Sequence, residues 1–217
     1  MTHVKPWLYA TALALTLHAT GHAADKVPER RIEGTTITSE RDPAVTITLP
    51  QNAVYVGATR WDLYEVADCE LILLVEADEQ RRVQRLYWVQ FEAYLPSNTH
   101  AYTYKFAEKT AHAGREWDVA THFGPTSNTP KPTGDGAHMR ELLKKAGYSL
   151  APEAMNVRLV TLLDDARRKE LMIIYGEDLS LSGTTVAELG KPGNEAKWSS
   201  LKSALIERAK ENVHLQF

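Results

Sequence analysis

Residues 70–95, ELILLVEADEQRRVQRLYWVQFEAYL, hold the pattern that decides the fold. The short apolar run 70–76 and the longer run 83–95 are rich in β-branched and aromatic residues, which favour strands, and a charged turn separates them. The stretch 55–66, which precedes them, is β-prone and partly alternating. These three segments predict a three-stranded antiparallel meander.

The next stretch, 96–136, is the most irregular part of the chain, and its end is rich in proline and glycine, which favour loops. Two segments within it, 101–106 and 116–123, alternate and predict a second hairpin. In the first segment, the aromatic residues that share one side are Tyr102, Tyr104 and Phe106.

Two helices and a further hairpin are expected after this stretch. Residues 135–146 carry an apolar stripe at helical spacing, with Asp135 as the expected cap and a glycine following the last turn. The apolar runs 157–163 and 170–175 enclose a charged tip and predict the hairpin. A C-terminal helix is expected over 194–212. This order predicts an α+β fold, a mainly antiparallel sheet of about six to eight strands with two helices packed on one face.

The chain is expected to have three parts. Residues 1–23 combine a basic start, an uncharged apolar stretch and small residues before a cleavage point after Ala23, which predicts a secretory signal peptide. Residues 24–42 are polar and aperiodic and predict a flexible N-terminal arm. Residues 43–217 are expected to form a single globular domain. The expected location is therefore periplasmic or secreted.

Charge and composition limit the classes of partner. The chain has 25 Lys and Arg against 28 Asp and Glu, a formal net charge of −3, which argues against nucleic-acid binding. The apolar stretch of the leader is too short to span a bilayer, so no integral membrane segment is expected in the mature chain. The one cysteine, Cys69, lies beside an apolar run and is expected to be a small buried hydrophobe.

Common catalytic motifs are missing from the sequence, including glycine-rich phosphate loops, a nucleophile elbow, zinc-protease motifs and Cys-x-x-Cys. No cofactor and no metal site is therefore predicted. Asp118 and His122 suggest a metal pair, but on a strand they would lie roughly 13 Å apart, too far to share an ion. Glu116 and Asp118 are closer, and a solvated strand face is the preferred interpretation of them.

The run 83–95 supplies the predicted binding residues. One side of this strand is mainly apolar and is expected to face the core. The other side mixes aromatic and polar groups and is either a half-solvated outer face or the lining of a pocket. Its predicted ligand-binding residues are Trp88, Gln90, Glu92 and Tyr94.

Three residues are candidates for catalysis. Glu92 lies among aromatic residues, where loss of solvent disfavours the charged carboxylate and suits a general acid. The alternative is an exposed glutamate, or one paired with Arg60 or Arg158. His100 and His122 are candidate bases, because ordered irregular segments often carry function.

Three functions from different classes follow from these residues. The preferred one is an exported, non-catalytic binding protein for a small amphipathic ligand held between the sheet and the helices. The second is a hydrolase or lyase whose Glu92 is brought within a water-bridged contact of His100 or His122 by folding. The third is an interaction module of an envelope assembly that uses the 24–42 arm and a sheet edge.

Overall fold

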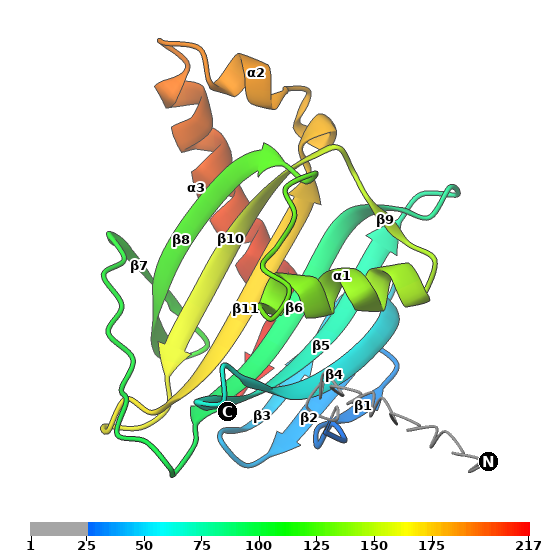
Figure 1. The fold of residues 1–217 in the computed structure, drawn as a ribbon. Coiled ribbons are helices and arrows are strands. Elements are labelled where there is room, and N and C mark those ends of the chain that lie inside the picture. The colour runs from blue at the N-terminus through cyan, green and yellow to red at the C-terminus, as the bar shows by residue number, and fades with distance from the viewer. Residues whose placement is uncertain (1–25) are drawn as a thin grey trace, which may run out of the picture.

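The computed structural model describes residues 26–217, and the predicted signal peptide at residues 1–23 lies outside the described residues. Two sheets, three α-helices and one short 3-10 helix make up this part of the chain (Figure 1). In chain order the elements are β1 (Arg31–Glu33), β2 (Thr36–Glu40), β3 (Ala44–Thr48), β4 (Val54–Leu63), β5 (Ala67–Ala77), β6 (Arg82–Tyr94), β7 (Glu108–His112), β8 (Arg115–Pro125), α1 (Asp135–Lys145), β9 (Ser149–Leu150), β10 (Glu153–Leu162), β11 (Lys169–Asp178), η1 (Leu179–Ser182), α2 (Val186–Leu189), α3 (Glu195–Asn212) and β12 (His214–Gln216).

An eight-stranded sheet forms the centre of the fold. Its strands follow the order β4-β5-β6-β11-β10-β8-β7, and every neighbouring pair on this path is antiparallel. The short strand β9 pairs in parallel with the beginning of β6. The predicted meander is confirmed as β4, β5 and β6, and the predicted C-terminal hairpin as β10 and β11. The expectation of a mainly antiparallel sheet accompanied by helices is therefore confirmed.

Both faces of this sheet are buried, and alternate residues of β5 divide between two cores. Leu71 and Leu73 belong to one core with Trp88, while Ile72 and Leu74 belong to the other with Val89. We call the first side the front face and the second the back face. A strand buried on both sides reads as a continuous apolar run, which explains the uninterrupted 71–75 segment.

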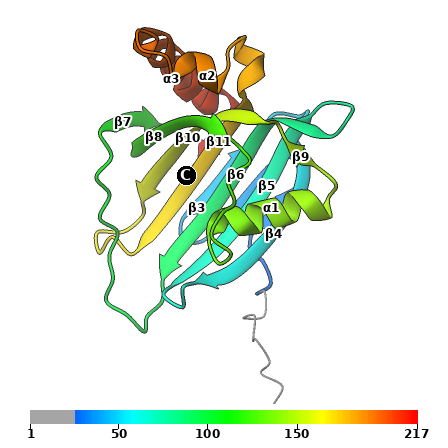
Figure 2. The same cartoon turned by 45° about the horizontal axis from the view of Figure 1, so that its top comes forward.

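The two long helices lie on opposite faces of the sheet, which differs from the expected single face. Helix α1 packs on the front face through Leu143, and α3 packs on the back face through Leu205 and Ala209. Figures 1 and 2 show the two helices on different sides of the strands. The expectation was wrong because a helix stripe records that a side is buried and carries no information about which sheet face buries it.

The second sheet covers the rest of the back face and includes most of the expected arm. Its order is β1-β2-β3-β12, and its residues Ile37 and Ile47 are fully buried against the back face. Residues 26–42, which belong to the segment expected to be a flexible arm, therefore contain two paired strands. Arg30 also fixes this segment to β5, since its guanidinium donates to the buried Glu70 carboxylate at 2.8 Å.

The expected hairpin between 101–106 and 116–123 is replaced by a different pairing. Strand β8 pairs with β7, whereas residues 101–106 form no regular strand. Their predicted shared side is nevertheless present, because the rings of Tyr102 and Tyr104 stack with centroids 5.8 Å apart, and those of Tyr104 and Phe106 with centroids 5.0 Å apart. The alternation thus reflects an extended segment that packs its aromatic side chains without joining the sheet.

Candidate functional site

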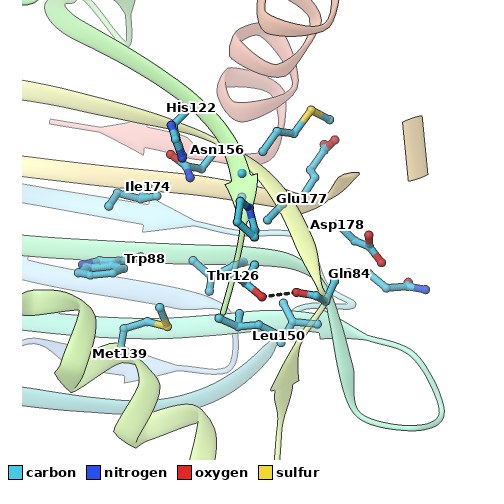
Figure 3. A pocket seen from close by; sticks show the side chains of 18 of the residues that line it. Gln84, Trp88, His122, Thr126, Met139, Leu150, Asn156, Ile174, Glu177 and Asp178 are labelled. Atoms are coloured by element: carbon cyan, nitrogen blue, oxygen red, sulfur yellow. Dashed lines mark hydrogen bonds between the residues drawn. The ribbon is translucent and has the colours of Figure 1, made fainter. Parts of the chain in front are cut away.

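A pocket of about 250 Å³ lies between α1 and the front face of the sheet (Figure 3). Trp88 from β6 and Ile174 from β11 contribute its apolar wall on the sheet side. Met139 from α1 and Leu150 from β9 contribute the apolar wall on the other side. Apolar walls with a few polar groups are typical of sites for small molecules.

Small residues create this pocket. Four residues of the lining have little or no side chain. Gly124, Ala154 and Gly176 lie on the neighbouring strands β8, β10 and β11, and Ala151 directly follows β9. Gly176 lies inside β11 directly opposite Asn156, and a Cβ atom added there would meet its nearest neighbours at 3.7 Å, an ordinary contact distance. A glycine within a strand often marks a place where another group approaches closely. No steric conflict therefore requires glycine at position 176, and its lack of a side chain leaves space inside the pocket.

Polar residues lie at one side of the pocket. His122 on β8 and Asn156 on β10 are directly opposite each other in the antiparallel register, and both line the pocket. Figure 3 shows their side chains next to one another. The His122 side chain is exposed, so these two residues can offer hydrogen bonds to a ligand at the solvent side of the pocket.

A group of acidic residues lies further along the same face, and we call Glu92, Asp135 and Glu170 the acidic cluster. Glu92 on β6 is directly opposite Glu170 on β11. On its other side Glu92 is opposite Cys69, which is in turn opposite Trp61. These four residues therefore form one row across β4, β5, β6 and β11. Asp135 joins them from the start of α1.

Hydrogen bonds connect the pocket wall to the acidic cluster. Trp88 Nε1 donates to Gln90 Oε1 at 2.9 Å, and Gln90 Nε2 donates to Glu92 Oε2 at 2.9 Å. Gln90 is fully buried. Tyr102 donates to Glu92 Oε1 at 2.8 Å, and Tyr104 donates to Glu170. The predicted face of β6 is thus one connected polar network that begins at the pocket.

Burial and mutual repulsion shift the protonation of the cluster. Loss of solvent and the charge of Glu92 raise the pKa of Glu170 to about 8. The same two causes raise the pKa of Asp135. Because a buried carboxylate without a partner is costly, Glu170 is mainly protonated at neutral pH. The carboxyl groups of the cluster therefore hold fewer negative charges than their number suggests.

A basic residue, Arg158, and a group of stacked aromatic rings lie beside the acidic cluster. The guanidinium of Arg158 is 4.0 Å from Glu170 Oε1, a long ion pair, and lies 5.6 Å from the Tyr104 ring centroid. Tyr94 stacks on Tyr102 with centroids 4.5 Å apart, so aromatic rings border the cluster on the side of residues 94–106.

Several polar atoms in this region have no hydrogen-bond partner in residues 26–217. The buried unpartnered atoms are Trp61 Nε1, Asp135 Oδ1, Arg158 Nε and Glu170 Oε1. Unsatisfied buried polar groups are rare in proteins and suggest that a water, ion or ligand completes the site. Every one of these residues lies on or over the front face, next to the acidic cluster or in its row.

The predicted site residues have different places in this structure. Trp88 lines the pocket, Gln90 and Glu92 belong to the network, and Tyr94 stacks beside it. The His100 ring is 5.7 Å from that of Tyr94 and is exposed.

The register separates Glu92 from His122. His122 belongs to the row of Leu86, three strand spacings and six residues away from Glu92, roughly 25 Å in all. A catalytic pair of Glu92 with His122, which requires a water-bridged contact, is therefore ruled out by this arrangement. The alternative pairings of Glu92 with Arg60 or Arg158 do not form either: Arg60 binds Asp68, and the acid nearest Arg158 is Glu170.

Sequence reasoning missed Asp135, Arg158 and Glu170 as site residues. Asp135 was expected to cap α1, whereas the residue in the cap position is Gly134 and makes no side-chain cap hydrogen bond. Glu170 appeared only as the first residue of a β-prone run. The useful signal was a carboxylate at a strand position that is otherwise apolar, but its significance depends on which residue faces it.

Comparisons of this chain with protein-family models, with curated proteins and with solved structures find no match. Within residues 26–217, no group of three or more His, Cys, Asp or Glu side chains has an arrangement that could hold a metal ion. The same residues include no helix of the length and apolarity needed to cross a membrane.

Proposed function

We propose that this chain is an exported, non-catalytic binding protein that takes a small amphipathic ligand between the front face of the sheet and α1. One observation carries the proposal: an apolar pocket is joined by hydrogen bonds from Trp88 through Gln90 to the acidic cluster. An amphipathic molecule needs both surfaces, one for its apolar part and one for its polar group. The leader-like residues 1–23 support a location in the periplasm or outside the cell.

The apolar part of the ligand fits the pocket walls. Met139 and Leu150 face Trp88 and Ile174 across the space. Burial of apolar surface contributes about 25 cal/mol per Å², so a short alkyl chain enclosed there gains several kcal/mol from the hydrophobic effect. Gly176 lines the pocket without a side chain and so leaves room for such a chain.

The test is a substitution at Gly176 that fills part of the pocket from the sheet side. Gly176→Val places two methyl groups beside Leu86 and Asn156, where the added Cβ itself meets ordinary contact distances. Binding of decanol, a neutral amphiphile, is measured by titration calorimetry and by the change in tryptophan fluorescence. We expect the wild-type protein to bind decanol and Gly176→Val to bind it at least about tenfold more weakly, a loss of about 1.4 kcal/mol.

The matched control is Ala111→Val on β7, where the side chain is exposed and pairs with Glu116, at the end of β8 away from the pocket residue His122. It adds the same two methyl groups and is expected to leave decanol binding unchanged. If Gly176→Val binds decanol as tightly as the wild type, the ligand does not use this pocket. If the wild type binds no decyl compound of any charge, the proposed function is wrong.

A further inference from the structure

We propose that the polar group of the ligand is a primary ammonium, bound at the acidic cluster, so that the ligand class is an amine with an apolar chain. This inference rests on the proposed function, because it assigns the polar end of the ligand whose apolar end lies in the pocket.

The charge of the cluster is compensated only in part, by the proton that Glu170 holds at neutral pH and by one distant guanidinium. Three carboxyl groups, from Glu92, Asp135 and Glu170, interact with one another strongly enough that each of the last two is affected by the charge of Glu92. The basic group that acts on them is Arg158, and its nearest contact is long at 4.0 Å. A second cation is therefore the missing component of the site.

Two acceptor atoms in the cluster are free for such a cation. Glu170 Oε1 and Asp135 Oδ1 are buried and have no hydrogen-bond partner in residues 26–217, and Glu170 is only 1 % exposed. An ammonium group carries three donors and no acceptor, so it can satisfy both oxygens and still reach Glu92. A carboxylate or phosphate would find donors in Trp61 Nε1 and Arg158 Nε, which also lack partners in the described part of the chain, but it would add negative charge beside three carboxyl groups.

Aromatic rings lie beside these carboxyl groups. Tyr102 and Tyr104 hold Glu92 and Glu170 by hydrogen bonds, and their stacked rings border the cluster. Tyr102 and Tyr104 turn their hydroxyl groups toward the carboxyl groups and stack their ring faces on neighbouring rings, so they keep water away from the cluster. Where water is excluded, the attraction between carboxylates and an ammonium ion is stronger.

The two ends of the ligand site follow the same helix and the same strand. On α1, Asp135 at the cluster and Met139 at the pocket are four residues apart and so lie on one face of the helix. On β6, Trp88 at the pocket and Glu92 at the cluster are four residues apart, about 13 Å along the strand. A decyl chain with a terminal amine is of suitable length to reach from one end to the other.

The first experiment compares three decyl compounds with the wild-type protein by titration calorimetry near pH 8.5, where Glu170 is largely ionised. We expect decylamine to bind at least about tenfold more tightly than decanol, since hydrogen bonds between charged groups are roughly twice as strong as those between neutral groups, and decanoate to bind most weakly. Equal binding of amine and alcohol, or tighter binding of decanoate, would overturn the inference and leave the proposed function standing. Failure of all three compounds would instead overturn the proposed function.

The second experiment assigns the amine to the cluster. Glu170→Gln keeps the size of the side chain and removes its negative charge, and we expect decylamine binding to fall about tenfold while decanol binding changes little. Decanol binding also reports that the variant is folded, and Asp135→Asn provides a second variant with the same expected result. Glu116→Gln, an exposed position on β8, is the control. A preference for the amine that survives in both Glu170→Gln and Asp135→Asn would show that the ammonium lies elsewhere.

Discussion

Glu92 and Glu170 face each other directly across two neighbouring strands, β6 and β11, on the buried front face of the sheet. Like charges in directly opposite positions destabilise a sheet, and the burial of Glu170 adds the cost of removing its carboxylate from water. The pair is tolerated because Glu170 stays protonated at neutral pH, as its pKa of about 8 indicates. This relationship makes both stability and binding depend on pH.

Stability should fall as pH rises through the range in which Glu170 ionises. The groups that face Glu170 are Glu92 from β6, Asp135 from α1, Arg158 from β10, Tyr104 from the 95–107 segment and, one row position further, Cys69 from β5. Its pKa rises from 4.5 to about 8 on folding, so the folded state holds a proton that the unfolded state has lost. The stabilisation is complete below pH 4.5 and is lost as pH rises to about 8, at up to about 1.4 kcal/mol per pH unit.

Urea unfolding of wild type and Glu170→Gln at several pH values measures this effect. The free energy of unfolding of the variant should gain on that of the wild type as pH rises from about 5 to 8. Glu116→Gln, which changes an exposed carboxylate, should run parallel to the wild type. A constant difference between Glu170→Gln and wild type across this range would show that Glu170 is ionised in the folded protein.

Decylamine binding should strengthen with pH over the same range. The amine binds best to the ionised cluster, so at neutral pH its binding must release the proton from Glu170. The affinity should therefore increase as pH approaches about 8 and level off above it. Calorimetry at neutral pH in two buffers of different ionisation enthalpy measures the released protons, and Glu170→Gln should release fewer. An affinity that is flat with pH would contradict this linkage.

The N-terminal segment should depend on one buried ion pair. Arg30 Nη1 donates to Glu70 Oε2 at 2.8 Å, while the backbone N–H groups of Glu29 and Arg30 donate to Glu70 Oε1 at 3.0 and 2.9 Å. Glu70 is 1 % exposed, so Arg30→Met leaves a buried carboxylate without its cation and should cost about 3–5 kcal/mol of unfolding free energy.

The same substitution one residue later provides the control. Arg31 pairs with Glu33, and both side chains are more than half exposed. Exposed ion pairs contribute about 0–1 kcal/mol, so Arg31→Met should have little effect on urea unfolding. Similar losses for Arg30→Met and Arg31→Met would mean that the Glu70 contact does not fix the segment.

Cys69 should be chemically inert in the folded protein. Its side chain is fully buried, and burial together with the charge of Glu92 raises the pKa of its thiol well above the usual range. Because the thiolate is the reactive form, a thiol reagent near pH 8 should label the chain only after urea is added. Rapid labelling of the native protein would show that the front face opens at this row. Comparison of labelling rates with and without decylamine then reports whether the ligand covers it.

The sequence was sufficient for local structure and insufficient for how the elements combine. The continuous apolar run 71–75 and the alternating run 83–95 correctly indicated neighbouring strands, and Asn194 correctly marked the beginning of α3. The expectation of a flexible arm missed β1 and β2 because these strands are short, charged residues flank them, and they are held by the pairing of β1 with β2 and of β2 with β3. Polar composition alone does not distinguish such strands from a mobile segment.

The candidate site shows the same limit. The mixed face of β6 was visible as Trp88, Gln90, Glu92 and Tyr94, since alternation assigns side chains to one side of a strand. The facing residue Glu170 is 78 positions further along the chain, and the register that joins it to Glu92 is a property of the assembled sheet. The raised pKa of Glu170 depends on its contact with Glu92, so the sequence pattern could not predict it either.

The two faces of strand β6 have different roles, and alternate residues of its sequence belong to each face. From position 86 onward its even-numbered residues lie on the front face, where we propose that the ligand binds, and its odd-numbered residues, such as Tyr87 and Val89, face the core that holds the two sheets together. A substitution at an even position can therefore change what the protein binds while the odd positions preserve the way it folds. Descendants of one ancestral chain could diverge in ligand preference through these even positions alone, with their odd positions left as the trace of shared origin.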